Sequence, residues 1–562
     1  MSMVREPYYP GGVPRSINYP EIPLYYFLEN SARKFPRRDA IIFYGRRLTY
    51  SKIWDETRRL AGAFRGLGIS DGDRVGLLMP NIPQFIIGYY AAMLAGGVVV
   101  AVNPLNSNEE IERELSDTEV KILVVLDRFL DKIEMKVGIT KVISYPEAYL
   151  PDRVRLFSRL RRGYFNVPDD ALKFETLTKG MPLEEKAEID PRRDPAVIQY
   201  TGGTTGVPKG VVLTHFSLVA NALQASSWLR GWGFSAKPQP AGWPVVVCAI
   251  PFFHIYGMTV GMNEGVQFGS TLVLVPDPKP QAIMRAIDKY GATHFPAIPQ
   301  MIREIVKHPE VGRFNLSSLI SCVSGGASIT NELAKKFMEI TGAHLYRGYG
   351  LTEASPVTHC TTLEDNAASE SDGLPFPDTE AKIVDLQRGE IEMPPIQEGE
   401  LLVRGPQVMA GYWRDAEATA YALRGGWLHT GDVAFIDETG HLFVVDRSQD
   451  QIIASGHTVW PSQVEEVLKS HPSVETAAVL GMPDPLKCAT EVKALVKIRD
   501  GLDGQRIREE LLSHCLKQLK SHQVPSEIFF VESIPLTLQG KVDRRALKVR
   551  LEDREASSNP ST

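Results

Sequence analysis

Short runs of β-branched and other apolar residues alternate with stretches of helical periodicity along most of this chain. The runs cover Val75–Met79, Val98–Val102, Lys121–Val125, Val245–Ile250, Thr271–Val275 and Leu319–Ser324. Strands that alternate with helices favour parallel sheets covered by helices. We therefore predict an α/β protein whose large N-terminal domain is built from parallel-rich sheets.

The length of 562 residues exceeds the roughly 150 residues of an average domain several-fold, so more than one domain is expected. After about Phe443 the pattern changes to helices at Ser462–Ser470 and Gly504–Lys520 among three short strands. This pattern predicts a small α+β C-terminal domain over 447–550. The N-terminal domain then covers 1–446, and residues 551–562 form a solvated tail.

Composition excludes several classes of protein. With 43% hydrophobic and 23% charged residues, the chain matches a soluble globular protein. Its 62 basic and 68 acidic residues give a net charge of −6, which offers no basic field for nucleic acid. The five cysteines are odd in number and contain no C-x-x-C pair, so we expect a reducing, cytoplasmic location.

The segment Phe85–Val102 has 18 residues without a charge, close to the lower limit for a membrane span. Gly96 and Gly97 divide it into a helix-like half and a β-branched half. This division favours a buried helix-turn-strand unit. The N-terminus also lacks the apolar region of a secretory signal. We expect no transmembrane segment.

The segment Tyr200–Val211 (YTGGTTGVPKGV) carries three glycines and three threonines before Lys209. Glycines permit close backbone approach to phosphates, threonine hydroxyls donate hydrogen bonds, and lysine adds positive charge. The spacing nearly imitates a Walker A loop. However, Pro208 and Gly210 stand where that loop needs Gly and Ser or Thr, so a P-loop NTPase is disfavoured.

Six further segments follow in order: PFFHIYG (251–257), SGGA (324–327), YGLTE (349–353), GWLHTGD (426–432), DRSQDQIIASG (446–456) and GKVDRRAL (540–547). Together with the phosphate loop, they resemble the adenylate-forming superfamily of acyl-CoA synthetases, luciferase-like enzymes and adenylation domains. The resemblance covers nearly the whole chain, and fatty acyl-CoA synthetases are the most similar.

The resemblance implies a ligase reaction in two steps. A carboxylic acid attacks the α-phosphate of ATP to give an acyl-adenylate and pyrophosphate, and the thiol of coenzyme A then displaces AMP. Both steps concentrate negative charge, so Mg²⁺ and a cation beside the reacting oxygens are expected. The substrates are ATP, a carboxylic acid and coenzyme A.

The resemblance also assigns roles to individual residues. The β- and γ-phosphates are expected on Thr201, Gly202, Gly203, Thr204, Thr205, Gly206 and Lys209. Glu353 and Thr201 are expected to hold Mg²⁺, and Thr352 the α-phosphate. Adenine is expected on Tyr349, with Gly325, Gly326 and Ala327 lining its edge. Gly348 and Gly350 are further expected ATP-binding residues, and the ribose is expected on Asp432 and Arg447.

Four further residues are given roles in catalysis or movement. His254 is expected beside the substrate carboxylate, Lys541 is the expected catalytic cation of the first step, and Gly456 lies where pantetheine of coenzyme A passes. Gln449 is the expected hinge of a mobile C-terminal domain, where Asp or Lys is usual. Judged alone, His254 and Lys541 would be a packed core histidine and a surface lysine; the segments around them favour the site roles.

The acid is the least constrained part of this prediction. PFFHIYG lacks the Asp of amino-acid adenylation domains, and Gly350 replaces the Trp that closes the pocket of acetyl-type enzymes, so space is expected there. We expect the substrate to be a medium- or long-chain fatty acid, with an aryl acid as the alternative. A luciferase-like oxygenase and a non-catalytic nucleotide-binding protein are further alternatives, and a homodimeric state is left open. The stretch Ser369–Pro377 matches the family poorly and stays unassigned.

Overall fold

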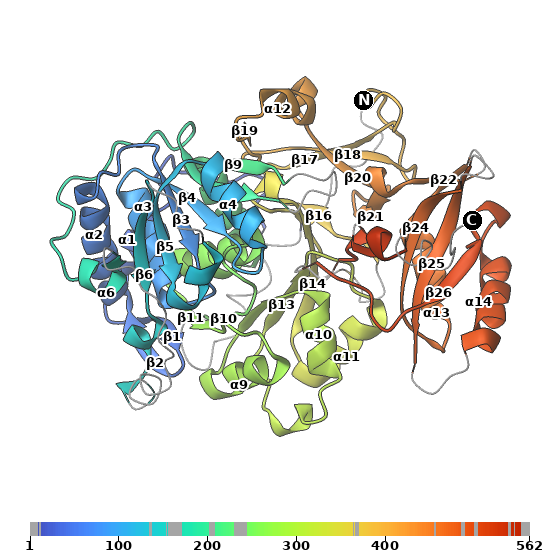
Figure 1. The fold of residues 1–562 in the computed structure, drawn as a ribbon, viewed down its shortest axis with the longest axis horizontal. Coiled ribbons are helices and arrows are strands. Elements are labelled where there is room, and N and C mark those ends of the chain that lie inside the picture. Colours follow the sequence, from blue (N-terminus) through green and yellow to red (C-terminus); the bar gives the residue numbers. More distant parts are fainter. Residues whose placement is uncertain are drawn as a thin grey trace, which may run out of the picture.

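The computed structural model describes residues 9, 13–133, 138–152, 154, 171–201, 208–229, 244–363, 365, 370–454, 457–484, 489–499, 504–537, 541–544 and 546–551. Within these residues the strands form five sheets (Figure 1). An eight-stranded sheet has the order β19 (Gly411–Tyr412), β9 (Gly210–Thr214), β8 (Pro195–Tyr200), β4 (Val98–Val102), β3 (Arg74–Leu78), β5 (Val120–Leu126), β6 (Thr140–Ser144), β7 (Leu172–Lys173). It is parallel from β8 to β7, and β9 and β19 add antiparallel strands at one edge.

A nine-stranded sheet has the order β16 (Leu374–Pro375), β15 (Val357–Cys360), β14 (His344–Gly350), β13 (Ser321–Gly325), β12 (His294–Ala297), β10 (Val245–Cys248), β11 (Thr271–Leu274), β1 (Asp39–Phe43), β2 (Arg46–Thr49). Its strands run parallel from β14 to β1 and antiparallel at both ends. These two sheets confirm the predicted α/β class with parallel-rich sheets.

Three smaller sheets follow. An antiparallel sheet contains β17 (Glu380–Val384), β18 (Gly399–Arg404), β20 (Leu428–Ile436) and β21 (Leu442–Arg447). The hairpin β22 (Ile452–Ala454) and β23 (His457–Val459) comes next, and then the sheet β24 (Val474–Asp484), β25 (Ala489–Ile498), β26 (Glu527–Phe530). The predicted boundary after residue 446 therefore falls at the end of β21.

The α-helices are α1 (Tyr26–Lys34), α2 (Tyr50–Gly66), α3 (Pro83–Leu94), α4 (Asn108–Asp117), α6 (Phe174–Leu177), α7 (His215–Leu229), α8 (Glu264–Phe268), α9 (Pro280–Tyr290), α10 (Pro299–Val306), α11 (Asn331–Thr341), α12 (Ala416–Ala422), α13 (Pro461–Ser470) and α14 (Gly504–Gln518). The element η4 (Gly257–Asn263) is a π-helix. Short 3₁₀ turns are η1 (Asp127–Lys132), η2 (Pro146–Tyr149), η5 (Val311–Arg313), η6 (Thr352–Ala354), η7 (Arg424–Gly426), η8 (Ser448–Asp450) and η9 (Ser521–Gln523).

The uncharged segment Phe85–Val102 folds as a buried helix followed by a buried strand. Every residue of α3 is buried, as expected of a helix without a polar face. The chain turns at Gly96, which has φ +80°, and β4 then enters the eight-stranded sheet between β3 and β8. No helix among the described residues is long and apolar enough to cross a membrane.

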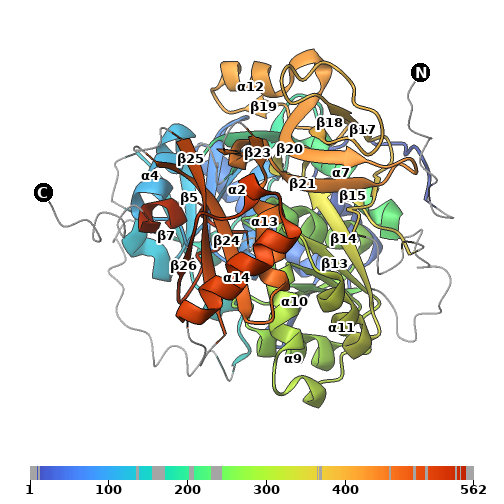
Figure 2. The ribbon, with the colours of Figure 1, turned by 90° about the vertical axis from the view of Figure 1, so that its right-hand side faces the viewer.

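The C-terminal strands β24–β26 form a unit beside the rest of the chain, at the right of Figure 1. Helices α13 and α14 cover one face of this sheet (Figure 2), where Leu468 and Leu511 pack on its apolar side chains. Leu547 and Leu551 pack with Leu480 and Leu495 in a second apolar cluster. The strands and helices predicted here are confirmed, and the unit has an apolar core of its own.

The cysteines are buried and unpaired where the structure describes them, namely Cys248, Cys322, Cys360 and Cys515. Cys488 lies outside the described residues.

Candidate functional site

The predicted phosphate loop connects two antiparallel strands. Tyr200 at the end of β8 pairs with Gly210 at the start of β9, and the amide of Thr201 donates a hydrogen bond to the carbonyl of Lys209 (3.1 Å). A Walker A loop instead joins a strand to a helix, so this topology agrees with setting a P-loop NTPase aside. The middle of the loop lies outside the described residues: Gly202, Gly203, Thr204, Thr205 and Gly206.

The predicted magnesium ligand Glu353 lies in η6, close to the end of this loop. Its carbonyl accepts a hydrogen bond from the amide of Met409 (2.8 Å), and its Oε1 accepts one from the hydroxyl of Tyr412 (2.9 Å). Tyr412 belongs to β19, which pairs with β9. Thr352 precedes Glu353 in the same turn. Pairing of β9 with β19 thus brings Lys209, Thr352 and Glu353 to one edge of the eight-stranded sheet.

The predicted adenine-binding segments lie on neighbouring strands of the nine-stranded sheet. Gly325 ends β13 and pairs with Gly348 on β14, and Gly326 and Ala327 follow directly. A Cβ placed on Gly325 would lie 3.2 Å from the ring of Tyr256, so the absence of a side chain lets the strand approach that ring. The topology therefore places the SGGA and YGLTE segments side by side at the same strand ends.

Tyr349, Asp432 and Arg447 contact one another directly. The hydroxyl of Tyr349 donates a hydrogen bond to Oδ2 of Asp432, and Nε of Arg447 forms an ion pair with Oδ1 (2.8 Å). Asp432 on β20 is opposite Arg447 on β21, and its side chain is buried. The carboxylate of Asp432 raises the pKa of Arg447, whereas burial raises the pKa of Tyr349. The two predicted ribose ligands are thus held together before any ligand enters.

One prediction about this region is wrong. Gly350 was expected to open space for the acid, but a Cβ at this position would lie 2.1 Å from the carbonyl oxygen of Pro356. The amide of Leu351 also donates a hydrogen bond to that oxygen (3.0 Å). Gly350 therefore permits a close approach of two backbone segments, and a side chain at this position would have no room.

His254 lies in a bend three residues before the start of the π-helix η4. Its Nδ1 accepts a hydrogen bond from the amide of Tyr256 (3.2 Å), so this nitrogen carries no proton. Desolvation by its surroundings, and then the positive charge of Lys541, lower the pKa of His254 to about 4. The imidazole is therefore neutral at physiological pH and is close enough to Lys541 for the two to interact electrostatically.

Lys541 comes from the C-terminal unit and lies among residues of the preceding sheet. Its side chain is accessible to solvent, yet the protein atoms around it, and then the charge of Arg447, lower its pKa. The carboxylates of Asp432 and Asp372 oppose this shift. No hydrogen bond or ion pair of its ammonium is found with the described residues. The structure thus brings Lys541, His254, Asp432 and Arg447 together from distant parts of the sequence.

A neighbouring arginine anchors the Lys541 segment within the C-terminal unit. The guanidinium of Arg544 forms ion pairs with Asp450 in η8 (3.3 Å) and Glu465 in α13 (2.7 Å). Gln449, the predicted hinge, lies in η8 between β21 and β22. Gly456 lies outside the described residues. The segment that carries Lys541 is therefore linked to the turn in which the hinge was predicted.

Residues 28–413 match the family model of the AMP-binding enzyme, and residues 463–541 match that of the AMP-binding enzyme C-terminal domain. The chain belongs to the AMP-binding enzyme family. This match confirms the resemblance to the adenylate-forming superfamily inferred from the motifs.

Curated relatives cover nearly the full length. The chain is 38% identical to a long-chain-fatty-acid–CoA ligase of Bacillus subtilis (strain 168) over 551 residues, 96% of each chain. It is 34% identical to the protein of that name in Escherichia coli O157:H7, over 96% of this chain and 97% of the relative. It is also 33% identical to 4-coumarate–CoA ligase 4 of Arabidopsis thaliana, over 90% of this chain and 87% of the relative.

Solved structures share the fold. The anthranilate CoA ligase AuaEII, in complex with anthranoyl-AMP, has a TM-score of 0.81 at 24% identity, over 95% of this chain and 98% of that one. The amide bond synthetase McbA from Marinactinospora thermotolerans has a TM-score of 0.77 at 29% identity, over 94% of this chain and 100% of that one. The AMP-binding fold therefore extends over nearly the whole chain.

The donors near Glu353 suit a magnesium ion that arrives with the nucleotide. The described residues contain no group of three or more His, Cys, Asp or Glu side chains that could hold a metal. They do contain one carboxylate, Glu353, which follows the hydroxyl-bearing Thr352 in the same turn. Mg²⁺ is commonly bound by one or two carboxylates, substrate phosphates and water. A site of this kind would receive Mg²⁺ together with ATP, as MgATP.

Two residues near the site were missed by the sequence analysis. Asp372, from the unassigned stretch Ser369–Pro377, accepts a hydrogen bond from the amide of Val444 (2.9 Å), and its enclosed position raises its pKa to about 6. It interacts electrostatically with Asp432 and Lys541. Tyr412 is the second. Neither lies in one of the seven segments, and only the pairing of distant strands identifies them.

Proposed function

We propose that this protein is an AMP-forming acid–CoA ligase that activates a medium- or long-chain fatty acid through an acyl-adenylate. The names of the relatives support the reaction and the acid. The observation that carries the proposal is the position of Lys541, which interacts electrostatically with His254 and Arg447 although it comes from the C-terminal unit.

In the first step the acid carboxylate attacks the α-phosphate of ATP. Two anions must meet, so an ammonium between them stabilises the transition state more than the ground state. Lys541 would supply this charge, because no ion pair with the described residues competes for it. Asp432 would accept the ribose hydroxyls while Arg447 holds its orientation. His254, neutral at physiological pH, would border the carboxylate without neutralising it.

The acyl chain would extend away from this point along the nine-stranded sheet. Val260 of the π-helix η4 lines a cavity of about 30 Å³ together with other, mainly apolar, side chains, among them Val246, Phe268, Phe295 and Val323. Ser321, at the other end of β13 from Gly325, also lines this cavity. The mainly apolar lining of this cavity would suit the far end of an aliphatic chain.

One carboxylic acid, Glu264, also lines this cavity. Glu264 is buried, and its Oε1 has no hydrogen-bond partner among the described residues. Burial raises the pKa of Glu264 well above its ordinary value. Burial therefore favours the uncharged form of this carboxyl.

The second step requires Lys541 to leave. We propose that residues 447–550 are a mobile domain that rotates about Gln449, so that Gly456 replaces Lys541 beside the adenylate and lets coenzyme A approach. The ion pair between Arg544 and Asp450 would make the Lys541 segment move together with this turn. We also propose Mg²⁺ as the partner of ATP and a cytoplasmic location, in line with the unpaired, buried cysteines.

The test is an acid panel of acetate, octanoate, palmitate and benzoate with MgATP and coenzyme A. Catalytic efficiency is measured as pyrophosphate and AMP formation. Octanoate or palmitate should exceed acetate and benzoate. Highest efficiency with acetate contradicts the chain-length assignment, and highest efficiency with benzoate supports the aryl-acid alternative. If no acid releases pyrophosphate, the ligase assignment fails.

A further inference from the structure

Tyr412 lies between two predicted ligands of MgATP. Its hydroxyl donates a hydrogen bond to Oε1 of Glu353 (2.9 Å), and Nζ of Lys209 lies 5.0 Å from the centre of its ring. An ammonium within about 6 Å of an aromatic ring face is attracted to it. Asp415 lies 4.0 Å from the same ammonium. One side chain therefore contacts both the expected metal ligand and the expected phosphate ligand.

The backbone beside Tyr412 is attached to the end of the phosphate loop. Tyr412 pairs with Val211 across β19 and β9, and the amide of Trp413 donates a hydrogen bond to the carbonyl of Gly210 (2.7 Å). A Cβ on Gly210 would lie 3.2 Å from Cβ of Trp413. Any displacement of this segment would thus move Tyr412 and the loop end together.

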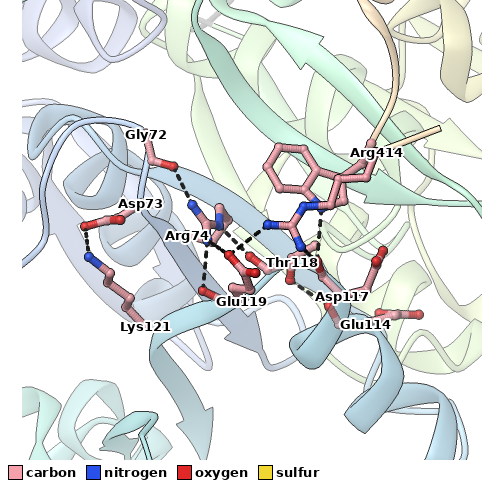
Figure 3. Close-up of polar contacts among 10 residues, drawn as sticks. Gly72, Asp73, Arg74, Glu114, Asp117, Thr118, Glu119, Lys121 and Arg414 are labelled. Atoms are coloured by element: carbon pink, nitrogen blue, oxygen red, sulfur yellow. Dashed lines mark hydrogen bonds and ion pairs between the residues drawn. The ribbon is translucent and has the colours of Figure 1, made fainter. Parts of the chain in front are cut away.

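A cluster of polar residues, which we call the clamp, fixes the other side of the segment (Figure 3). It consists of Arg74, Asp117, Glu119, Trp413 and Arg414. Nε1 of Trp413 donates a hydrogen bond to the carbonyl of Asp117 (3.1 Å), and Arg414 and Arg74 both form ion pairs with Glu119 (2.8 and 3.0 Å). The Arg74 guanidinium lies 5.6 Å from the Trp413 ring centre.

The clamp is better explained by positioning than by stability. Glu119 and Arg414 are 57% and 51% exposed, and exposed ion pairs contribute only about 0–1 kcal/mol. Both residues also have positive φ, +49° and +53°, a backbone conformation that is unfavourable for residues other than glycine. The contacts instead restrict where Trp413, and hence Tyr412, can lie.

We propose that Tyr412 is a positioning residue for MgATP: its hydroxyl orients the Glu353 carboxylate, its ring holds the Lys209 ammonium, and the clamp fixes both in place. This proposal rests on the proposed function. A hydrogen bond to one carboxylate oxygen leaves the other for the metal and sets its direction. The loss of such an outer contact typically lowers metal affinity or activity about 10- to 100-fold.

The test measures binding of a non-hydrolysable ATP analogue by calorimetry, with Mg²⁺ and with EDTA. Tyr412→Phe removes the hydroxyl and keeps the ring, so affinity with Mg²⁺ should fall about tenfold and affinity in EDTA should not change. Tyr421→Phe is the control, because Tyr421 lies exposed on the neighbouring helix α12. It should bind as the wild type does in both conditions.

A double-mutant cycle separates positioning from general damage. In a Glu353→Gln background, Tyr412→Phe should cause little further loss, since its effect acts through that carboxylate. An equal loss with Mg²⁺ and with EDTA, a loss that persists in Glu353→Gln, or no loss at all overturns the proposal. If the wild type itself does not bind the analogue with Mg²⁺, the proposed function fails instead.

Discussion

The nucleotide side of the site and the Lys541 segment are built in opposite ways. Asp432, Arg447 and Tyr349 bind one another through buried or half-buried contacts on two neighbouring sheets. Among the described residues, the hydrogen bonds of Lys541 are made by its backbone, to the backbone and the hydroxyl of Thr537 on its own segment. Preorganised groups stabilise charge without reorganisation, whereas a group that must leave between two steps gains from having no fixed partner. In the proposed mechanism, this difference separates a fixed binding surface from a cation that is delivered to it.

The largest effect is expected from removal of the delivered cation. Lys541→Ala should lower the rate of pyrophosphate formation about 10²- to 10³-fold, the usual loss for one stabilising donor of developing charge. The KM for ATP should change little, because the contact is made chiefly in the transition state. Lys548→Ala, an exposed lysine of the same unit, is the control. A large rise in KM with unchanged kcat would instead make Lys541 a ground-state binding residue.

A substitution among the residues proposed to bind the nucleotide should weaken the binding of ATP. Asp432→Asn removes the charge that Arg447 faces and weakens a charged hydrogen bond, at a cost of about 1.5–3 kcal/mol. This corresponds to about a 10- to 150-fold weaker affinity for ATP, measured by calorimetry. Glu438→Gln, exposed in the same hairpin, should bind normally. Retained ATP affinity in Asp432→Asn would remove this residue from the ribose site.

Tight backbone packing on the fixed side predicts a stability effect. In Gly350→Ala the new Cβ must displace the carbonyl of Pro356, and overpacking of this kind typically costs about 1–3 kcal/mol. Denaturant unfolding measures the loss. Gly312→Ala, where a Cβ would meet nothing within 4 Å, should leave stability nearly unchanged. Equal stability of the two variants would mean that the strands around Gly350 can separate.

The smallest effect concerns pH. The pKa of His254 is lowered to about 4, so the folded protein keeps this imidazole neutral above that value. Its contribution to stability is present above the ordinary pKa of 6.5 and is lost as pH falls toward 4. Between pH 6 and 8 the rate of pyrophosphate formation should therefore show no inflection from His254. An inflection near pH 6.5 that disappears in His254→Asn would contradict this assignment.

Much of the fold could be predicted because the relevant signals are local. Thr49 caps α2 by accepting a hydrogen bond from the amide of Lys52, and the division of Phe85–Val102 at two glycines separates α3 from β4. These elements follow from capping, turn chemistry and periodicity.

The parts that could not be predicted depend on contacts between distant segments. Tyr412 reaches Glu353 only because β19 pairs with β9, and Asp372 approaches Lys541 only through β21 and the C-terminal unit. The error at Gly350 has the same origin. The absence of a side chain at Gly350 suggested an open space, but the backbone of Pro356 occupies it. The motifs identified the chemical groups, and strand pairing decided their neighbours.

The central claim is that Lys541 serves only one of two half-reactions. The most direct test supplies Lys541→Ala and the wild type with preformed acyl-adenylate and coenzyme A, and measures thioester formation in a single turnover. A near-normal rate, beside the large loss in pyrophosphate formation, is the predicted result. An equal loss in both half-reactions would contradict the account, because Lys541 would then be a structural residue or the C-terminal unit would not rotate.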